Sequence, residues 1–362
     1  MTNHYQTNTT KVCIQKATYS TIDLDALLQP LGGLTAYTHK GEHVLLKLNL
    51  LSASTPEKAV VTNPQLVRKT AEAVLKAGAI PIIGDSPGGQ FTKRRLTKVY
   101  EKAGLLALSS DLGVELNYDT RTTKVQIPNG KQLTTTPLCN YILNADKIIS
   151  LPKIKTHAQM IMTLAVKNMY GAIPGLTKAK YHVLYRGKPA FANMLLDVLL
   201  VASPDLIIMD GIIGMQGEGP GAGEPVSLGV LLAADNPIAM DLSVCKMLQI
   251  EPVGIPTLKR AKLRKLWPQH IIYPQLTPDN VTYNGFILPK TADYLLTGKK
   301  TPRQSPKVTV KCISCGQCAE ICPRQAITNT PDKAHIDYAK CIRCYCCQEI
   351  CPEKAIILEE HL

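Results

Sequence analysis

The sequence "CIRCYCCQEICP" occupies residues 341–352 and contains five of the twelve cysteines in the chain. Four of these five follow the spacing C-x2-C-x2-C-x3-C and precede a proline: Cys341, Cys344, Cys347 and Cys351. An upstream stretch, "CISCGQCAEICP" at residues 312–323, repeats the spacing with four more cysteines: Cys312, Cys315, Cys318 and Cys322. Such a duplicated motif predicts the fold and the cofactor of the C-terminal segment together.

This spacing is typical of proteins that bind cubane [4Fe–4S] clusters, in which three cysteines of a run bind one cluster and the fourth binds the other. We therefore predict two [4Fe–4S] clusters, one bound by Cys312, Cys315, Cys318 and Cys351, the other by Cys322, Cys341, Cys344 and Cys347. Zinc sites use separated C-x2-C pairs instead, and residues 1–20 lack the features of a secretory signal that a disulfide scaffold requires. Residues 307–362 resemble the bacterial two-cluster ferredoxins.

Cys346 lies next to a predicted ligand but does not belong to the repeat. We interpret it as a bystander thiol, and a role as an alternative cluster ligand stays open.

Length, charge and hydropathy limit the classes of protein to which the chain can belong. Its 362 residues suffice for about two or three domains. The chain has a formal net charge of +13. Residues 311–362 have a net charge of −1, so the remaining residues have a net charge of +14. The lysines are scattered and aromatic residues are only 5%, so we expect an anionic small ligand or an acidic redox partner rather than nucleic acid. No apolar run reaches the ~18 residues of a membrane span, and we expect a cytoplasmic protein.

Apolar β-branched runs alternate with amphipathic stretches along residues 1–266. This alternation predicts an α/β body with an open, mostly parallel sheet and flanking helices. Residues 63–79, for example, predict a helix with Asn63 as its N-cap and Pro64 in its first turn. Residues 267–306, rich in Pro, Thr and Lys, predict a linker or irregular extension. Residues 307–362 predict the α+β ferredoxin-like domain.

Ligands of open α/β sheets bind at the carboxyl ends of the strands, and the sequence "GDSPGG" at residues 84–89 falls at such a place. Its glycines and the following helix predict an anion site that includes Asp85 and Ser86, and a plain turn is the alternative.

The sequence "DGIIGMQGEGPGAGEP" at residues 210–225 contains six glycines. It does not open a helix, so we reject a dinucleotide-binding fingerprint. Gly217 and Gly219 then predict a close approach to a ligand or to another backbone. Asp210, at the predicted end of a buried strand, is a candidate site carboxylate.

The sequence "LPKIKTHAQMIMTLAVKNMYGAIPG" at residues 151–175 combines polar side chains with an apolar segment. We predict an active site formed by five of them: Lys153, Lys155, His157, Lys167 and Asn168. Lys167 follows "MIMTLAV", and a lysine in partly buried surroundings usually serves through its charge or its lowered pKa.

The stretch at residues 151–175 and the sequence "DGIIGMQGEGPGAGEPVSLGVLLAADNPIAMD" resemble the family known as domain of unknown function number 362, over about residues 11–250. "LLKLNL" and "GDSPGG" match earlier motifs of that family. The resemblance implies an iron–sulfur protein, because a ferredoxin tail commonly accompanies this domain. His157, Lys167 and the following "IPG" are also similar to the histidine–lysine segment of nickel-dependent lactate racemases, although the glycine-rich spacing between the two residues is absent here.

A bare electron carrier needs only about 55 residues, which the tail supplies by itself. We therefore expect an iron–sulfur oxidoreductase of anaerobic metabolism, in which the tail relays electrons between an external partner protein and a small anionic ligand in the body. Lys153, Lys155 and Lys167 would bind negative charge, His157 would transfer a proton, and Asp85 and Asp210 would orient them or bind a metal. The alternatives are an electron carrier or assembly factor that docks a redox partner, and redox-neutral acid/base chemistry.

Overall fold

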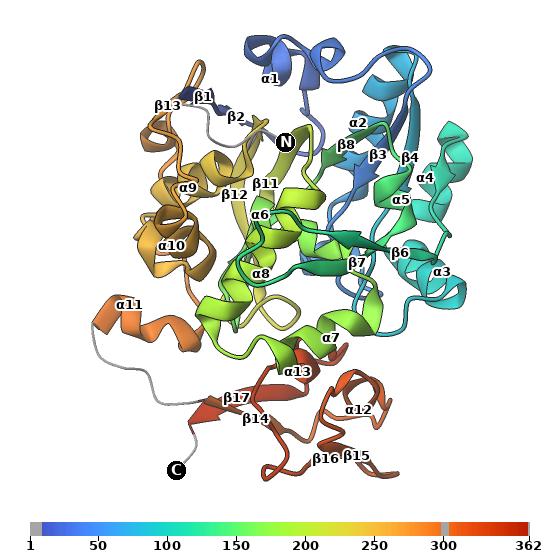
Figure 1. The fold of residues 1–362 in the computed structure, drawn as a ribbon, viewed down its shortest axis with the longest axis vertical. Helices are drawn as coiled ribbons and strands as arrows, with labels where there is room; N and C mark the ends of the chain where they lie inside the picture. Colours follow the sequence, from blue (N-terminus) through green and yellow to red (C-terminus); the bar gives the residue numbers. More distant parts are fainter. Residues whose placement is uncertain (1–8, 298–303, 361–362) are drawn as a thin grey trace.

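The computed structural model describes residues 9–297 and 304–360. A large α/β body comes first, and a small domain coloured orange to red in Figure 1 lies below it. Residues 1–8, 298–303 and 361–362, which fall within the predicted segments 1–266, 267–306 and 307–362, lie outside the described ranges.

The body is built on a nine-stranded mixed sheet. Seven strands follow the order β10 (Ile161–Thr163), β9 (Lys153–His157), β11 (Leu206–Gln216), β8 (Lys147–Ser150), β3 (His43–Lys47), β4 (Ile80–Gly84) and β5 (Glu115–Leu116). The pairs from β9 to β5 are parallel, whereas β10 pairs with β9 in the antiparallel direction. Two further strands, β12 (Glu224–Ala234) and β2 (Cys13–Lys16), extend the sheet from β11 with antiparallel pairing. The predicted mostly parallel sheet is confirmed.

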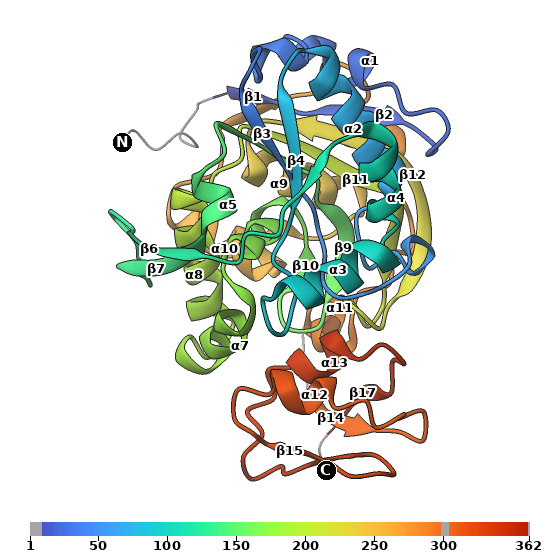
Figure 2. The same cartoon turned by 90° about the vertical axis from the view of Figure 1, so that its right-hand side faces the viewer.

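Both faces of the sheet are buried. Consecutive side chains of a strand point to opposite faces, and here each face packs into an apolar core. In β3, Val44 and Leu46 pack into one apolar core and Leu45 packs into the other. One core is covered by α1 (Leu24–Leu28), α2 (Pro64–Lys76), α3 (Lys93–Lys102) and α4 (Leu105–Leu112). The other is covered by α5 (Asn140–Leu143), α6 (Ala165–Asn168), α8 (Lys188–Val201), α9 (Pro237–Met247) and α10 (Pro256–Leu263). The helices therefore flank the sheet on both sides, as Figure 2 also shows.

Helix α2 confirms the capping signal in the sequence. The Asn63 side chain accepts a hydrogen bond from the Gln65 backbone N–H at 2.9 Å, and Pro64 occupies the first turn, where no intrahelical donor is needed. The same Asn-Pro start recurs in α9, where Asn236 accepts hydrogen bonds from Ile238 and Ala239. Local sequence therefore fixes where these helices begin.

Strand β11 corrects one prediction about the glycine-rich stretch. Asp210 does not end the strand, because β11 continues to Gln216 and then turns into β12. Gly211 and Gly214 lie inside the strand, where a Cβ atom would come within 3 Å of Ile154 atoms of the neighbouring β9. These glycines therefore permit close contact between adjacent strands.

Residues 267–297 run along the body. β13 (His270–Ile272) pairs in parallel with β1 (Thr9–Lys11), and the segment ends in α11 (Asp293–Thr297). Several of its apolar side chains pack against the core beneath α8, α9 and α10: Trp267, Ile271, Tyr273, Leu276, Tyr283, Phe286 and Leu288. Hydrophobic contact therefore holds this irregular segment against the body.

The C-terminal domain consists of two similar halves. β14 (Gln304–Val308) pairs with β17 (Ile356–Glu360), and β15 (Ile327–Asn329) pairs with β16 (Ala334–Ile336), both antiparallel. The short helices α12 (Gln317–Ile321) and α13 (Cys346–Ile350) follow the two cysteine runs. In both views α13 lies on the side of this domain that faces the body (Figures 1 and 2). Across residues 9–297 and 304–360, no helix is both long and apolar enough to cross a bilayer.

Candidate functional site

One predicted set of cluster ligands surrounds a small cavity in the C-terminal domain. Its members come from both cysteine runs: Cys312, Cys315, Cys318 and Cys351. The Ala334 backbone N–H donates to Cys312 Sγ at 3.4 Å, and the Ala355 backbone N–H donates to Cys351 Sγ at 3.3 Å. Such N–H···S hydrogen bonds are typical around iron–sulfur clusters, so these residues fit the group that the spacing predicts. We call them the outer set, because Cys315 is exposed.

We call the second set of cysteines the inner set, because its Cys344 packs against an apolar cluster that includes Ala179 of the body. Its members are Cys322, Cys341, Cys344 and Cys347. Cys341 is within electrostatic range of both Cys344 and Cys322, although Cys322 belongs to the other run. The Ala326 backbone N–H donates to Cys322 Sγ at 3.3 Å. The crossed grouping of the inner set therefore also fits the predicted ligand pattern.

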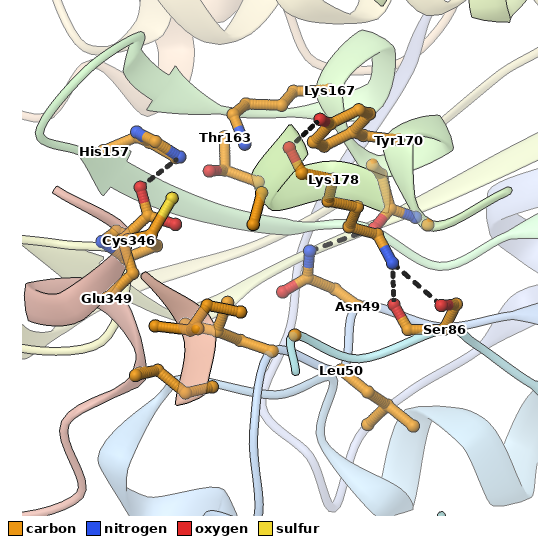
Figure 3. A pocket seen from close by; sticks show the side chains of 18 of the residues that line it. Asn49, Leu50, Ser86, His157, Thr163, Lys167, Tyr170, Lys178, Cys346 and Glu349 are labelled. Atoms are coloured by element: carbon orange, nitrogen blue, oxygen red, sulfur yellow. Dashed lines mark hydrogen bonds and ion pairs between the residues drawn. The ribbon is translucent and has the colours of Figure 1, made fainter. Parts of the chain in front are cut away.

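A cavity of about 100 Å³ lies where the body meets the C-terminal domain, and we call it the junction cavity. The body contributes basic side chains from β9, α6 and α7 (Gly175–Leu184). The C-terminal domain contributes Ile321, Cys346, Glu349 and Ile350, which come from α12 and α13. Figure 3 shows His157, Lys167 and Lys178 around the same space as Cys346 and Glu349. The cavity therefore joins two segments nearly 200 residues apart in the sequence.

Strand β9 places Lys155 and His157 in the wall of the junction cavity, because alternate residues of a strand share one face. The Lys155 side chain is 1% exposed, and its Nζ donates to the Val60 carbonyl at 2.8 Å. Burial, reinforced by the positive charges of Lys167 and Lys153, lowers the pKa of Lys155 to about 7. Lys155 can therefore hold or release a proton near neutral pH.

The hydrogen bonds of His157 define its protonation state. Its Nδ1 accepts hydrogen bonds from the backbone N–H groups of Gln159 (3.1 Å) and Met160 (3.3 Å), so Nδ1 carries no proton. The proton of the neutral ring then lies on Nε2, which faces Glu349 Oε1 at 3.3 Å. Burial lowers the pKa of His157 well below its usual value. His157 is therefore neutral, with its Nε2 near Glu349, whose Oε1 accepts no hydrogen bond in the described part of the chain.

The short helix α6 positions Lys167, and a residue of α9 caps this helix. The Asp241 carboxylate of α9 accepts hydrogen bonds from the backbone N–H groups of Ala165 (2.7 Å) and Val166 (3.3 Å) at the start of α6. Lys167 Nζ lies over the Tyr170 ring, 5.6 Å from its centroid, and has no hydrogen bond or ion pair within the described ranges. Burial lowers the pKa of Lys167, and the charge of Glu349 opposes that shift. This ammonium is thus available to a ligand.

Helix α7 brings Lys178 and His182 to the cavity, because residues four apart share one helix face. Lys178 Nζ donates to the Ser86 carbonyl at 2.6 Å and lies 2.8 Å from Ser86 Oγ. Burial lowers the pKa of Lys178 to about 8 and that of His182 to about 3. The sequence prediction missed both residues, although their spacing in "KAKYH" is the signal that could have identified them.

Four buried polar atoms in the cavity wall have no hydrogen-bond partner in the described part of the chain. They are Asn49 Oδ1, Thr163 Oγ1, His182 Nδ1 and Glu349 Oε1. Buried polar atoms in folded proteins are nearly always satisfied by protein, water or a ligand. The predicted Asn168 also lines the cavity, where its Oδ1 accepts from Asn49 Nδ2 at 3.0 Å. This wall therefore presents unsatisfied polar atoms to whatever occupies the space.

Asp210 and Lys153 lie outside the residues that line the cavity, contrary to the predicted shared site. Lys153 Nζ is 2.7 Å from Asp210 Oδ2, and both side chains are at most 1% exposed. Asp210 also accepts hydrogen bonds from Tyr19 Oη (2.9 Å) and the Asn63 backbone N–H (3.1 Å). The pair is therefore satisfied inside the body and connects the sheet to the start of α2.

Asp85 also lies behind the cavity wall, whereas Ser86 lines it. The Asp85 carboxylate pairs with the buried Lys47 at 2.8 Å and accepts the Leu50 backbone N–H at 2.6 Å. Gly171 separates this pair from the cavity, since a Cβ atom there would overlap both Asp85 and Lys47. Asp85 therefore supports the wall and does not face a ligand.

The glycine-rich turn between β11 and β12 approaches backbone, which was one of the two alternatives. A Cβ atom on Gly219 would overlap the Thr156 backbone, and one on Gly221 would overlap the Glu349 backbone. Gly217 adopts a positive φ of 71° and donates to the Ile287 carbonyl at 2.7 Å. Neither Gly217 nor Gly219 is among the residues that line the cavity. This turn thus forms a contact surface for α13.

The chain is similar to several known proteins and family models. Residues 44–246 match the family model described as "Domain of unknown function (DUF362)", and residues 311–355 match a 4Fe-4S dicluster domain. A thylakoid-associated protein of Synechocystis sp. is 35% identical over 277 residues, which cover 74% of this chain and 82% of that protein. The lactate racemase apoprotein of Thermoanaerobacterium thermosaccharolyticum aligns with a TM-score of 0.40 and 11% identity, over 68% of this chain and 58% of that one.

The dicluster match indicates 4Fe-4S cluster binding and iron–sulfur electron transfer, in agreement with the two cysteine runs. The match to residues 44–246 spans most of the body, including the strands that carry the junction cavity. The chain therefore belongs to the DUF362 family and carries a 4Fe-4S dicluster ferredoxin domain at its C-terminal end.

Proposed function

We propose that this protein is an iron–sulfur oxidoreductase that binds two [4Fe–4S] clusters and transfers electrons between an external partner protein and a small anionic ligand in the junction cavity. The observation that carries this proposal is the composition of that cavity. Lysines of the body form one wall, and residues adjacent to the inner set of cysteines form the facing wall. When bound, the clusters supply single electrons at low potential.

Packing at the junction supports a short path between the inner set and the cavity. Ala179, Ile321, Cys346 and Ile350 form one apolar cluster, all four line the cavity, and Cys344 of the inner set packs against them. The outer set lies around a different cavity with exposed surroundings, including Cys315 and the 62% exposed Ile313. We assign the inner set to exchange with the ligand and the outer set to exchange with a partner protein.

We assign anion binding and proton transfer to side chains that line the cavity. Lys167, Lys155 and Lys178 would bind and orient the anion. Lys155, whose pKa is about 7, would hold or release the proton that accompanies electron transfer. His157 would stay neutral beside Glu349, a role that replaces the acid/base function expected from the sequence.

The proposal can be tested with anaerobically prepared holoprotein. Its clusters are reduced with dithionite, the excess is removed, and re-oxidation by the small-molecule fraction of a cell extract is followed by visible absorption. Re-oxidation should proceed with the wild-type protein and slow by about 10²-fold in Lys167→Ala, while iron content stays unchanged. Lys167→Arg should not restore the rate, because a guanidinium does not fit the compact site of an ammonium.

Re-oxidation at equal rates in wild-type protein and Lys167→Ala would contradict the proposal. That result would favour the alternative of an electron carrier or assembly factor, whose clusters exchange electrons only with other proteins. The matched control is Lys124→Met on the exposed hairpin strand β6 (Thr122–Gln126), which removes the same charge from a residue that does not line the junction cavity.

A further inference from the structure

The junction cavity has an excess of basic side chains. The described residues that line it include three lysines and one acid: Lys155, Lys167, Lys178 and Glu349. Lys155 and Lys178 donate to carbonyl oxygens rather than to carboxylates, so their charges are not neutralised by those contacts. Burying excess charge is costly unless a counter-ion is present. The wall is therefore suited to an anion.

The buried polar atoms that have no hydrogen-bond partner in the described part of the chain indicate which hydrogen-bonding groups the ligand has. Thr163, Asn49 and His182 are each less than 9% exposed. The Thr163 hydroxyl can donate a hydrogen bond to an anionic oxygen, whereas Asn49 Oδ1 can only accept one. A ligand that satisfies both atoms has an anionic oxygen group and also an O–H or N–H donor.

The size and the apolar side of the cavity limit the rest of the ligand. Leu50, Ile321 and Ile350 line it together with the polar residues, and all three are at most 6% exposed. In Figure 3 Leu50 lies below the cavity, across from Lys167 and Tyr170. The volume of about 100 Å³ is smaller than the ~150 Å³ of an engineered cavity that binds benzene. A short alkyl chain fits this space, and a nucleotide does not.

We propose that the ligand of the junction cavity is a short-chain carboxylate of about two to four carbon atoms that carries a hydroxyl or amino group. Lys167 and Thr163 bind its carboxylate, and Asn49 Oδ1 accepts from its hydroxyl or amino group. This inference rests on the proposed function, since it names the ligand class of the same cavity. The ferredoxin domain completes the site through Ile321, Ile350 and Glu349.

The test is calorimetric titration of the oxidised holoprotein with glycolate, acetate and glycolamide. Glycolate should bind more tightly than acetate, which lacks the hydroxyl, and about tenfold or more tightly than uncharged glycolamide. Lys167→Met should weaken glycolate binding by about tenfold or more, and Lys124→Met should leave it unchanged. Thr163→Val, which changes shape little, provides a second variant and should weaken glycolate binding by several-fold. Iron content and melting temperature establish that each variant is folded.

Equal affinity for glycolate and glycolamide would overturn the inference, as would no binding of either at millimolar concentration. Binding that is independent of both Lys167 and Thr163 would also overturn it, because the carboxylate would then lie elsewhere. The proposed function is tested separately, by the electron paramagnetic resonance spectrum of the reduced protein. Glycolate binding that leaves this spectrum unchanged supports the carboxylate site and contradicts electron transfer to it.

Discussion

At the scale of single residues, the body has buried or partly buried lysines in two kinds of surroundings. Lys47 and Lys153 each face a buried carboxylate at 2.8 and 2.7 Å, and they contribute to the fold. Lys155 and Lys167 face the junction cavity with no carboxylate within 4 Å in the described part of the chain. A buried ammonium without a counter-ion is costly, and such costs are tolerated mainly at functional sites.

Cys346 lines the cavity and is the cysteine of the second run outside the repeat. Cys346→Ala should keep the iron content and the spectrum of the reduced protein, because the inner set stays complete. Cys344→Ala should lose iron, because a ligand is removed. Iron analysis and electron paramagnetic resonance measure both effects, and iron loss in Cys346→Ala would make this thiol a ligand.

The Lys153–Asp210 pair should be structural. Asp210→Asn leaves the Lys153 ammonium buried without a counter-ion, so the free energy of unfolding should fall by about 3–5 kcal/mol. Asp279→Asn removes one partner of the exposed Lys246–Asp279 pair and should cost about 0–1 kcal/mol. Urea titration measures both. A stable Asp210→Asn protein that fails to re-oxidise would instead support the catalytic role first predicted for Asp210.

The affinity for glycolate should fall as the pH rises. The pKa of Lys155 is lowered to about 7 by burial and by Lys167 and Lys153, against the opposing charges of Asp85 and Glu349. An anion binds the protonated ammonium, so affinity is full below this pKa and declines above it. Between pH 6 and pH 9 we expect a loss of up to about 10²-fold, measured by calorimetry. A constant affinity over this range would show that Lys155 does not contribute.

At the scale of elements, the site depends on contacts between segments that are short by themselves. Helix α6 has only four residues, too few for a stable isolated helix. Its position comes from Asp241 of α9, which accepts its first two backbone N–H groups. The β11–β12 turn likewise receives α13, with Gln348 Nε2 donating to the Glu218 carbonyl at 2.8 Å.

Asp241→Ala should therefore disturb α6 and, through it, Lys167. Loss of two buried hydrogen bonds should lower the free energy of unfolding by about 1–3 kcal/mol and weaken glycolate binding without loss of iron. Asp23→Ala is a suitable control, since Asp23 caps α1, on the opposite core, through an exposed hydrogen bond to the Ala26 backbone N–H. That variant should lose stability but keep its affinity for glycolate. Equal affinity in both variants would disprove the positioning role of Asp241.

At the scale of the whole molecule, the C-terminal domain is a wall of the site as well as a cluster-binding module. Lys354 Nζ donates to the Gly223 carbonyl at 2.8 Å and pairs with Glu224 at 2.9 Å, and His157 faces Glu349. Of these residues, His157 and Glu349 line the junction cavity, and Gly221 brings the body close to the α13 backbone. Contact between the two domains thus completes the wall of the cavity.

Two clusters per chain should give about eight iron and eight sulfide ions in anaerobically purified protein. Replacing Cys315 with Ala should halve the iron content or reduce it further, because the outer set loses one ligand. Iron and acid-labile sulfide analysis provides the measurement. Four or fewer irons in the wild-type protein, accompanied by zinc, would refute the assignment of two clusters.

Sequence alone determined the features that depend on local spacing. The cysteine runs predicted the ferredoxin domain, the alternation of apolar runs predicted the α/β body, and Asn63 marked a helix start. Cluster ligation, burial periodicity and capping each act over a few residues. His157, Lys155 and Lys167 were also identified, since polar residues within an apolar stretch are visible locally.

Only the tertiary structure decided which side chains share a site. Glu349 lies nearly 200 residues beyond Lys155 in the sequence, and no local pattern connects them, yet both line one cavity. Asp85 and Asp210 had the same sequence signal as the cavity residues, but Lys47 and Lys153 neutralise them inside the body. Whether a buried charge serves stability or binding depends on its partner, and that partner is determined by packing between distant segments of the chain.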